Sequence, residues 1–139
     1  MIAVFTVDGE PTGKQRPKAT KVGGYIQIYT PAKTRNYEAY IKMCYKRDCP
    51  NAYFAEGALR VDIKVFVQMP QSMSKKKQIQ ALSGELRPTV KPDFDNIIKT
   101  LCDALNGIAF KDDKQIVDAT YSKNYAEVPR VEMSIENIS

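Results

Sequence analysis

The stretch Lys91-Pro-Asp-Phe-Asp-Asn-Ile-Ile-Lys-Thr-Leu-Cys-Asp-Ala-Leu-Asn-Gly-Ile-Ala-Phe-Lys-Asp-Asp113 decides the fold, because it joins a helical apolar pattern to clear start and stop signals. Pro92 disfavours helical geometry at the residue before it, and Asp93 is a good N-cap. The pair Asn106-Gly107 is a strong stop signal. A helix is therefore predicted between these signals. Its buried stripe is predicted from the spacing of six apolar residues: Ile97, Ile98, Leu101, Ala104, Leu105 and Ile108.

The same stretch is an acidic island in a basic chain. Residues Asp93 to Asp118 include six Asp and three Lys, a balance of −3, so the other residues must carry +8 to give the total of +5. Grouped carboxylates raise one another's pKa unless a cation neutralises them. Mg²⁺ or Mn²⁺ does so with one or two carboxylates, waters and a substrate phosphate as ligands. An enzyme that uses a metal ion to act on nucleic-acid phosphates needs this arrangement.

The candidate ligands lie on the predicted helix and in the loop after it. Asp95, Lys99 and Asp103 share one helix face at i+4 intervals. Asp93 lies outside the first turn and is free to swing beside Asp95. Asp112-Asp113 precedes the next strand and is expected to fold back over the helix start. Lys99 is placed to stabilise charge on phosphoryl oxygens or to orient a water molecule.

A structural interpretation fits the same residues. Asp93 then caps the helix, Asp95 and Lys99 form an exposed pair worth about 0.3–0.5 kcal/mol, and Asp112-Asp113 is an ordinary turn. Charge patterns of this kind are common at helix starts. Taken alone, the residues leave both interpretations open.

Composition excludes several kinds of chemistry. The chain has no histidine, which removes Ser-His and Cys-His catalysis as well as imidazole metal ligands. Its three cysteines are odd in number and lack metal-ligand spacing, which argues against a disulfide framework or a zinc site and indicates a reduced, cytoplasmic protein. No apolar run approaches the roughly 20 residues of a membrane span, and the opening segment is too short for a signal peptide. The pI near 9.1 favours polyanionic partners.

The remaining pattern predicts one small domain over residues 1–139 with a mixed sheet. Alternation predicts strands at residues 2–7, 25–29 and 59–67, and a final antiparallel hairpin of residues 115–123 and 130–135. A helix is expected after Thr30-Pro31, with Tyr37, Tyr40, Ile41, Cys44 and Tyr45 on its buried face. A short basic helix is expected near Ser74. The fold class is therefore α/β, in the two-layer α+β sense, with helices mainly on one face of the sheet.

Basic residues outside the acidic island are candidates for contact with a phosphate backbone. They lie in a Gly- and Pro-punctuated loop, in the short basic helix and just before the first Asp; the set is Lys14, Arg16, Lys18, Lys75, Lys76, Lys77 and Lys91. Each of these segments is also compatible with an ordinary solvated surface.

Several motifs together resemble the RusA family of Holliday junction resolvases from bacteria and their phages. They are Asp93-Phe-Asp-Asn-Ile-Ile-Lys99, Asp103-Ala-Leu-Asn-Gly107, Lys111-Asp-Asp-Lys-Gln-Ile-Val117, Gly13-Lys-Gln-Arg-Pro-Lys18, Tyr29-Thr-Pro31 and the region of Ser74-Lys-Lys-Lys77. The resemblance covers most of the chain. It implies a homodimeric endonuclease, dependent on Mg²⁺ or Mn²⁺, that nicks symmetrically opposed strands of a four-way junction.

The resemblance also assigns roles by position. Asp93 and Asp95 match the paired acidic residues of the family motif, Asp113 the third metal-binding carboxylate and Lys99 the catalytic lysine. Asp113 is preferred to Asp112 because Gln-Ile-Val follows it.

The basic residues receive roles from the same resemblance. Lys14 and Arg16 match an N-terminal basic motif, for which DNA contact is expected. Some relatives carry a basic residue immediately before the first Asp, and Lys91 is expected to take that role from one position further upstream.

Two other functions stay open on the residues. A non-catalytic module for branched DNA would keep the basic segments, and a Mg²⁺-dependent phosphohydrolase of small nucleotides would keep the carboxylates. No protein partner is indicated.

Overall fold

The computed structural model describes residues 1–13, 18–29 and 32–139. The helices and strands are β1 (Ile2–Asp8), β2 (Lys18–Val22), β3 (Tyr25–Tyr29), α1 (Ala32–Asp48), β4 (Leu59–Gln68), α2 (Lys75–Leu82), α3 (Phe94–Leu105), a 3-10 helix (Asp113–Gln115), β5 (Ile116–Ala126) and β6 (Arg130–Asn137). Their order along the chain is the predicted one with two additions, β2 and the 3-10 helix, which were not predicted.

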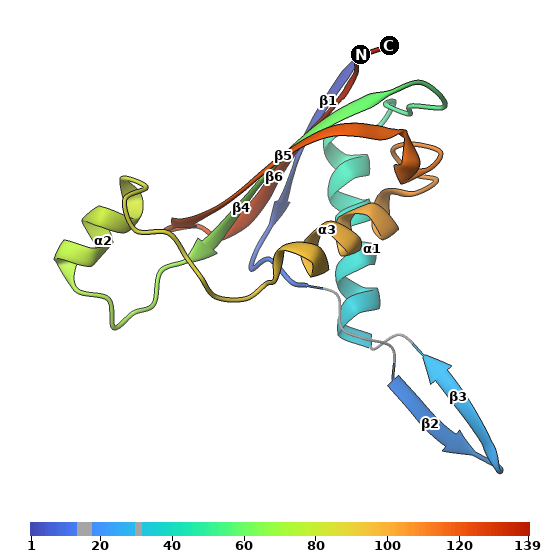
Figure 1. The fold of residues 1–139 in the computed structure, drawn as a ribbon, viewed down its shortest axis with the longest axis horizontal. Coiled ribbons are helices and arrows are strands. Elements are labelled where there is room, and N and C mark those ends of the chain that lie inside the picture. The colour runs from blue at the N-terminus through green and yellow to red at the C-terminus, as the bar shows by residue number, and fades with distance from the viewer. Residues whose placement is uncertain (14–17, 30–31) are drawn as a thin grey trace.

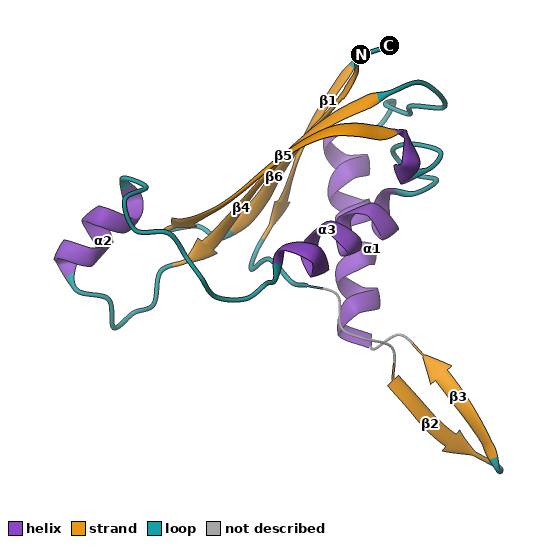
Figure 2. Ribbon diagram, viewed as in Figure 1, coloured by secondary structure: helices purple, strands orange, loops and turns teal. Residues whose placement is uncertain are grey.

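The main sheet is built around β4, and its strand order is β1-β6-β4-β5. Every second residue of β4 from Leu59 to Val67 is buried, so one face of the strand belongs to the core. β4 pairs antiparallel with β6 and parallel with β5, and β1 pairs antiparallel with β6. Helices α1 and α3 lie on one side of this sheet (Figure 2). The predicted two-layer fold with a mixed sheet is confirmed.

The prediction that β5 and β6 form a hairpin is wrong. β4 lies between them and bonds to both, so the two last strands are not neighbours. β4 has the most regular alternation of buried and exposed residues, and a central position pairs both of its edges. Nearness in sequence makes strand pairing frequent but does not require it.

The core confirms both predicted long helices. In α1 the buried residues include Tyr37, Ile41, Cys44 and Tyr45. In α3 they are Ile97, Thr100, Leu101, Ala104 and Leu105, while Ile98 and Ile108 are partly buried against the core. The ring of Phe5 meets that of Tyr45 edge to face at 5.0 Å. Cys44, Cys49 and Cys102 are free thiols, as predicted.

Strands β2 and β3 form a separate hairpin, joined by Gly23-Gly24 with φ of 55° and 87°. Two consecutive residues with positive φ suit a tight hairpin turn, which glycine adopts at little cost. Figure 1 shows this hairpin extending away from the sheet and helices. Lys18, which was predicted in a loop, begins β2 instead. Lys14, Arg16 and the predicted N-cap Thr30-Pro31 lie outside the described residues.

The face of the sheet opposite the helices is polar and has its own ion pairs. Arg60 meets Asp118 at 2.9 Å and Arg130 meets Glu132 at 3.0 Å. The guanidinium of Arg130 also lies 4.0 Å from the centre of the Phe66 ring. These exposed pairs each stabilise the fold by little. Among the helices that the structure describes, none is long and apolar enough to cross a membrane.

Candidate functional site

Two carboxylates stand at the start of α3 without a partner. Asp93 occupies the N-cap position, as predicted, but its side chain accepts no capping hydrogen bond. Asp95 follows in the first turn, and both residues are exposed. Within the described part of the chain, neither side chain makes a hydrogen bond or an ion pair. The positive end of the helix dipole favours negative charge at this place. Both carboxylates are therefore available to a ligand.

The segment that carries these carboxylates is anchored on β5. Lys123 Nζ donates hydrogen bonds to the carbonyl oxygens of Val90 and Pro92, the second at 3.0 Å. The rings of Phe94 and Tyr121 pack edge to face at 4.8 Å. Sequence reasoning missed Lys123. The sequence does contain a signal for Lys123. Side chains point to alternate sides along a strand, so Lys123 lies on the same side of β5 as Tyr121. A lysine on that side needs a polar partner for its ammonium group.

The family resemblance implies DNA cleavage, and Lys123→Met is expected to lower the rate of that cleavage by roughly tenfold while leaving the fold intact. The substitution keeps the apolar stem of the side chain but removes the donor that fixes the segment before Asp93, and small displacements of reacting groups cost about this much or more. Cleavage rate and melting temperature are measured together. Lys64→Met on the polar sheet face is the control. Equal cleavage rates for the two variants would contradict a positioning role for Lys123.

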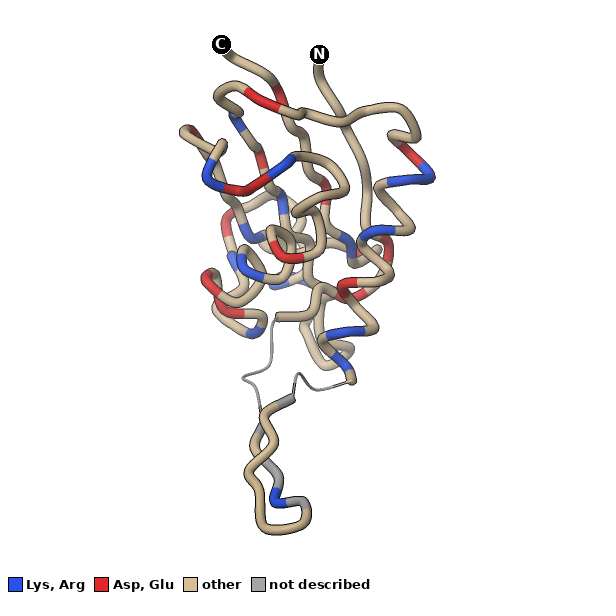
Figure 3. The backbone as a smooth tube through the Cα atoms, turned by 90° about the vertical axis from the view of Figure 1, so that its right-hand side faces the viewer, with Lys and Arg blue, Asp and Glu red and all other residues tan. Residues whose placement is uncertain are grey.

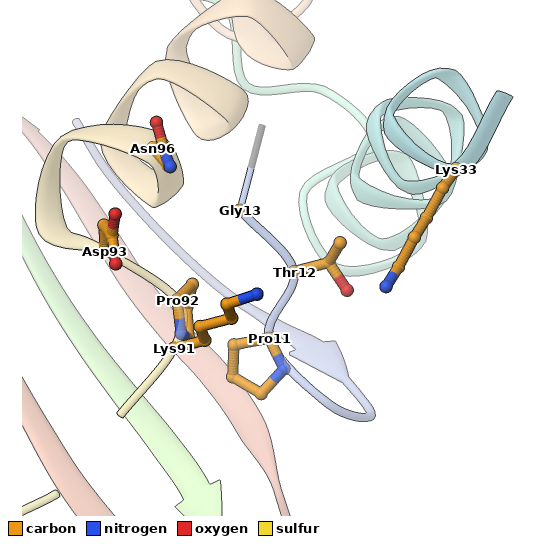
Figure 4. A pocket seen from close by; sticks show the side chains of 8 residues that line it. All are labelled: Pro11, Thr12, Gly13, Lys33, Lys91, Pro92, Asp93 and Asn96. Carbon is orange, nitrogen blue, oxygen red and sulfur yellow. The ribbon is translucent and has the colours of Figure 1, made fainter. Parts of the chain in front are cut away.

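A pocket of about 220 Å³ lies between the start of α3, the first turn of α1 and residues 11–13. Lys33, Lys91 and Asp93 line it, and the two lysines approach it from opposite sides (Figure 4). A Cβ added at Gly13 would meet Asn96 Cβ at 3.0 Å and Pro92 at 3.2 Å, so glycine permits this close contact. Lys33 was not among the predicted DNA-contact residues.

Lys99 is paired with Asp103, not with Asp95. Its Nζ lies 3.2 Å from Asp103 Oδ1, and 61% of the Lys99 side chain is exposed. The hydrogen bond that Lys99 donates to Asp103 and the negative charge of Asp103 raise the pKa of Lys99, so the ammonium is charged at neutral pH. The structural interpretation predicted an exposed ion pair between Asp95 and Lys99. Lys99 does form such a pair, but its acidic partner is Asp103. Asp95 stays free one turn before Lys99.

Asp112 and Asp113 have different tasks. Asp112 accepts a hydrogen bond from Lys114 N at 2.9 Å and forms a capping box with Gln115, so its carboxylate is used in the turn. Asp113 pairs with Asn106, which accepts from Asp113 N at 2.9 Å and donates to Asp113 Oδ2 at 3.3 Å. Asp113 therefore lies at the end of α3, whereas the sequence predicted it over the start.

The described residues contain no group of three or more His, Cys, Asp or Glu side chains that could hold a metal ion. The set of Asp93, Asp95 and Asp113 is therefore not assembled as a closed site. Magnesium, however, is commonly held by one or two carboxylates together with waters and substrate phosphates. The free carboxylates of Asp93 and Asp95 fit that open mode.

Cys102 is expected to react with alkylating reagents about a hundredfold more slowly than an ordinary thiol. Burial, followed by the charges of Asp113 and Asp103, raises the pKa of Cys102 from 9.0 to about 11. At pH 8 the thiolate fraction is then roughly 1 in 1,000 instead of 1 in 10, and its reactivity should rise with pH up to about 11. Iodoacetamide labelling followed by peptide mass spectrometry measures this rate. A rate in the folded protein equal to that in urea would contradict this protection.

Of the predicted basic residues that the structure describes, Lys91 lines the pocket beside Asp93. Lys75, Lys76 and Lys77 are exposed on the first turn of α2, the predicted short basic helix, and the side chain of Ser74 caps it by accepting a hydrogen bond from Lys77 N. In Figure 1 the first turn of α3 lies between α2 and the β2–β3 hairpin.

The family model described as Endodeoxyribonuclease RusA matches residues 8–136. A protein of Bacillus subtilis (strain 168), named Uncharacterized protein YqaN, is 42% identical over 137 residues, which cover 97% of this chain and 96% of that protein. The Crossover junction endodeoxyribonuclease rusA of Lactococcus phage r1t is 29% identical over 135 residues, covering 96% of this chain and 95% of the phage protein.

Proposed function

Because this chain belongs to the Endodeoxyribonuclease RusA family, we propose that it is a metal-dependent nuclease that resolves four-way DNA junctions by paired symmetric nicks. The observation that carries the proposal is the start of α3, where Asp93 and Asp95 are exposed and have no partner among the residues that the structure describes. Lys33 and Lys91 line the pocket beside Asp93. We further propose that the protein acts in the cytoplasm as a homodimer.

Asp93 and Asp95 are the residues that would hold Mg²⁺, with Mn²⁺ as a substitute. When bound, such an ion neutralises charge on the phosphodiester and supplies an activated water, which replaces the histidine base that the chain lacks. Lys123 keeps the two carboxylates in place through the carbonyl groups before them. Water and DNA phosphate would supply the remaining oxygen ligands of such an ion.

Lys99 supplies positive charge one helical turn from Asp95. Its ammonium is exposed, and Asp103 keeps it charged and orients it. It stabilises the negative charge that develops on the phosphoryl oxygens or orients the attacking water. Asp103 acts through Lys99 and is a positioning residue in this scheme.

DNA approaches from the helix side of the sheet. The opposite face pairs its cations with carboxylates, among them those of Asp118 and Glu132, and offers little free positive charge. Lys91, with Lys33 beside it in the pocket at the start of α3, and Lys75, Lys76 and Lys77 on α2 would contact the backbone around the cut phosphate. Lys14, Arg16 and Lys18 would extend this contact along the N-terminal segment.

Two symmetric cuts require two sites related by a twofold axis, so the protein is proposed to act as a homodimer. A supercoiled plasmid with a cruciform tests this. Coordinated cutting by a dimer converts the plasmid directly to linear DNA, whereas independent cutting accumulates nicked circles first. Accumulation of nicked circles, or a monomeric mass on DNA by light scattering, would contradict the paired mechanism.

The absence of a three-carboxylate group from the described residues favours one competing function, a non-catalytic module that binds branched DNA. Such a module would bind junctions as tightly as a nuclease does but would leave them intact. A phosphohydrolase of small nucleotides would show little dependence on salt. DNA affinity should instead fall steeply with salt, in proportion to the number of phosphates contacted.

Asp113→Asn is expected to reduce cleavage at least tenfold if Asp113 is the third acidic residue of the site. Asp112→Asn is the matched control, because Asn also caps helices well and the capping box of Asp112 has no part in catalysis. Both variants are assayed on a four-way junction in Mg²⁺. Equal activity of the two variants would remove Asp113 from the site and leave Asp93 and Asp95 as the acidic ligands.

A further inference from the structure

The β2–β3 hairpin exposes apolar side chains that the rest of the described chain does not cover. Tyr25, Ile26 and Ile28 on β3 are 80%, 75% and 73% exposed, more than any other large apolar side chain that the structure describes. A hairpin of two strands alone is at best marginally stable in water. Contiguous exposed apolar groups of this kind mark interaction sites. The hairpin therefore needs a partner.

The pairing register separates two surfaces of the hairpin. Lys21 lies opposite Ile26, and Ala19 lies opposite Ile28, so these four positions share one face. Tyr25 lies on the other face, next to the Gly23-Gly24 turn. One face thus combines branched aliphatic groups with a cation, and the tip carries an aromatic ring.

Charge identifies the chemistry of the partner. Residues 11–37 contain six Lys or Arg and no Asp or Glu, although the whole chain has a net charge of +5. The rest of the molecule therefore has a net charge of −1. Figure 3 shows the same contrast, with acidic and basic residues mixed over the body and no acidic residue on the hairpin. A surface with positive charge and exposed apolar groups matches a nucleic acid with exposed bases.

The hairpin is joined to the chain beside the candidate site. Gly13 is the last described residue before the hairpin, and it packs on Pro92 and Asn96 at the start of α3. After it, Lys33 lines the same pocket as Asp93. Five residues per strand give the hairpin a length of about 17 Å. At 3.4 Å per base step, that length corresponds to roughly five base pairs of DNA.

We propose that the β2–β3 hairpin recognises the branch point of DNA, with Tyr25 and Ile26 contacting unstacked bases and Lys21 contacting the adjacent phosphates. This inference rests on the proposed function, and it adds the element that distinguishes a junction from linear duplex. Bases at a branch point can be unstacked at lower cost than bases within a continuous helix. Apolar and aromatic side chains make use of such sites by insertion and stacking.

A second copy of the chain is the competing partner for the hairpin. DNA is favoured because only a polyanion neutralises six cations in an acid-free segment, whereas the body of another copy carries a net charge near zero. The carboxylates on the polar sheet face of a second copy are already engaged, as the Arg60–Asp118 pair illustrates.

The test compares two double variants of the full-length protein with the wild type. Tyr25→Ser with Ile26→Ser removes two exposed hairpin groups, and Met43→Ser with Val128→Ser removes two groups of similar exposure, 66% and 64%, elsewhere. Affinity for a four-way junction and for linear duplex of the same length is measured at one salt concentration. A junction with 2-aminopurine at the branch point reports unstacking. Light scattering gives the oligomeric state.

The hairpin variant should lose roughly tenfold or more of its preference for the junction and the 2-aminopurine signal, while duplex affinity changes less than twofold. The control variant should behave as wild type. Unchanged preference in the hairpin variant, or a loss accompanied by dissociation of a dimer, would overturn the inference. If the wild type itself shows no preference for the junction, that result contradicts the proposed function. A wild type that prefers the junction, with a hairpin variant that keeps the preference, contradicts only the role of the hairpin.

Discussion

Asp95→Asn is expected to abolish junction cleavage, with a loss of roughly a thousandfold or more. The substitution keeps the size of the side chain but removes one of two free carboxylates at the start of α3, and several kcal/mol of charge stabilisation correspond to a loss of this size. Because Asp95 has no partner among the described residues, melting temperature and circular dichroism should not change. Junction binding should persist or tighten, since one charge that repels phosphate is lost.

Asp118→Asn is the matched control for this experiment. It makes the same chemical change at an exposed carboxylate on the opposite face of the sheet, where Asp118 pairs with Arg60. Its cleavage rate should stay within twofold of wild type, because exposed pairs contribute little to the fold. Loss of secondary structure in Asp95→Asn would instead show that Asp95 supports the fold.

Leu101→Ala is expected to destabilise the protein by about 3–5 kcal/mol, the largest effect on stability that we predict. Leu101 is fully buried on α3, within the hydrophobic core. Its truncation leaves a cavity under the element that carries the candidate site. The free energy of unfolding is measured by urea denaturation followed by circular dichroism.

Leu82→Ala on α2 provides the comparison for Leu101→Ala. The side chain of Leu82 is 52% exposed, so its truncation should change stability by no more than about 0.5–1 kcal/mol. A loss below 1 kcal/mol for Leu101→Ala would contradict the central place of α3 in the core.

Local signals explain which parts of the fold the sequence predicts. The start of α3 follows Pro92 and Asp93, and its end coincides with Asn106-Gly107, because capping depends on neighbouring residues. The alternation of β4 likewise reports which of its faces is buried. The position of β4 between β5 and β6 has no local signal in the sequence, because it depends on which edges of distant strands form hydrogen bonds with one another.

The candidate site shows the same division. That Asp93 and Asp95 share one helix start follows from their spacing, and the structure places both there. Spacing does not determine the partner of Lys99, because both Asp95 and Asp103 lie four residues away and only the structure distinguishes them. The position of Asp113 depends on the amide of Asn106, and the role of Lys123 on β5 depends on a carbonyl contact 31 residues away in sequence.

The most direct test is cleavage of an end-labelled four-way junction and of linear duplex, side by side, in Mg²⁺, in Mn²⁺ and in EDTA. A metal-dependent junction resolvase should produce paired symmetric nicks on the junction alone, with none in EDTA and none with Asp95→Asn. Tight junction binding without cleavage in either metal would contradict this account, and it would make the protein a binding module whose carboxylates at the start of α3 serve no catalysis.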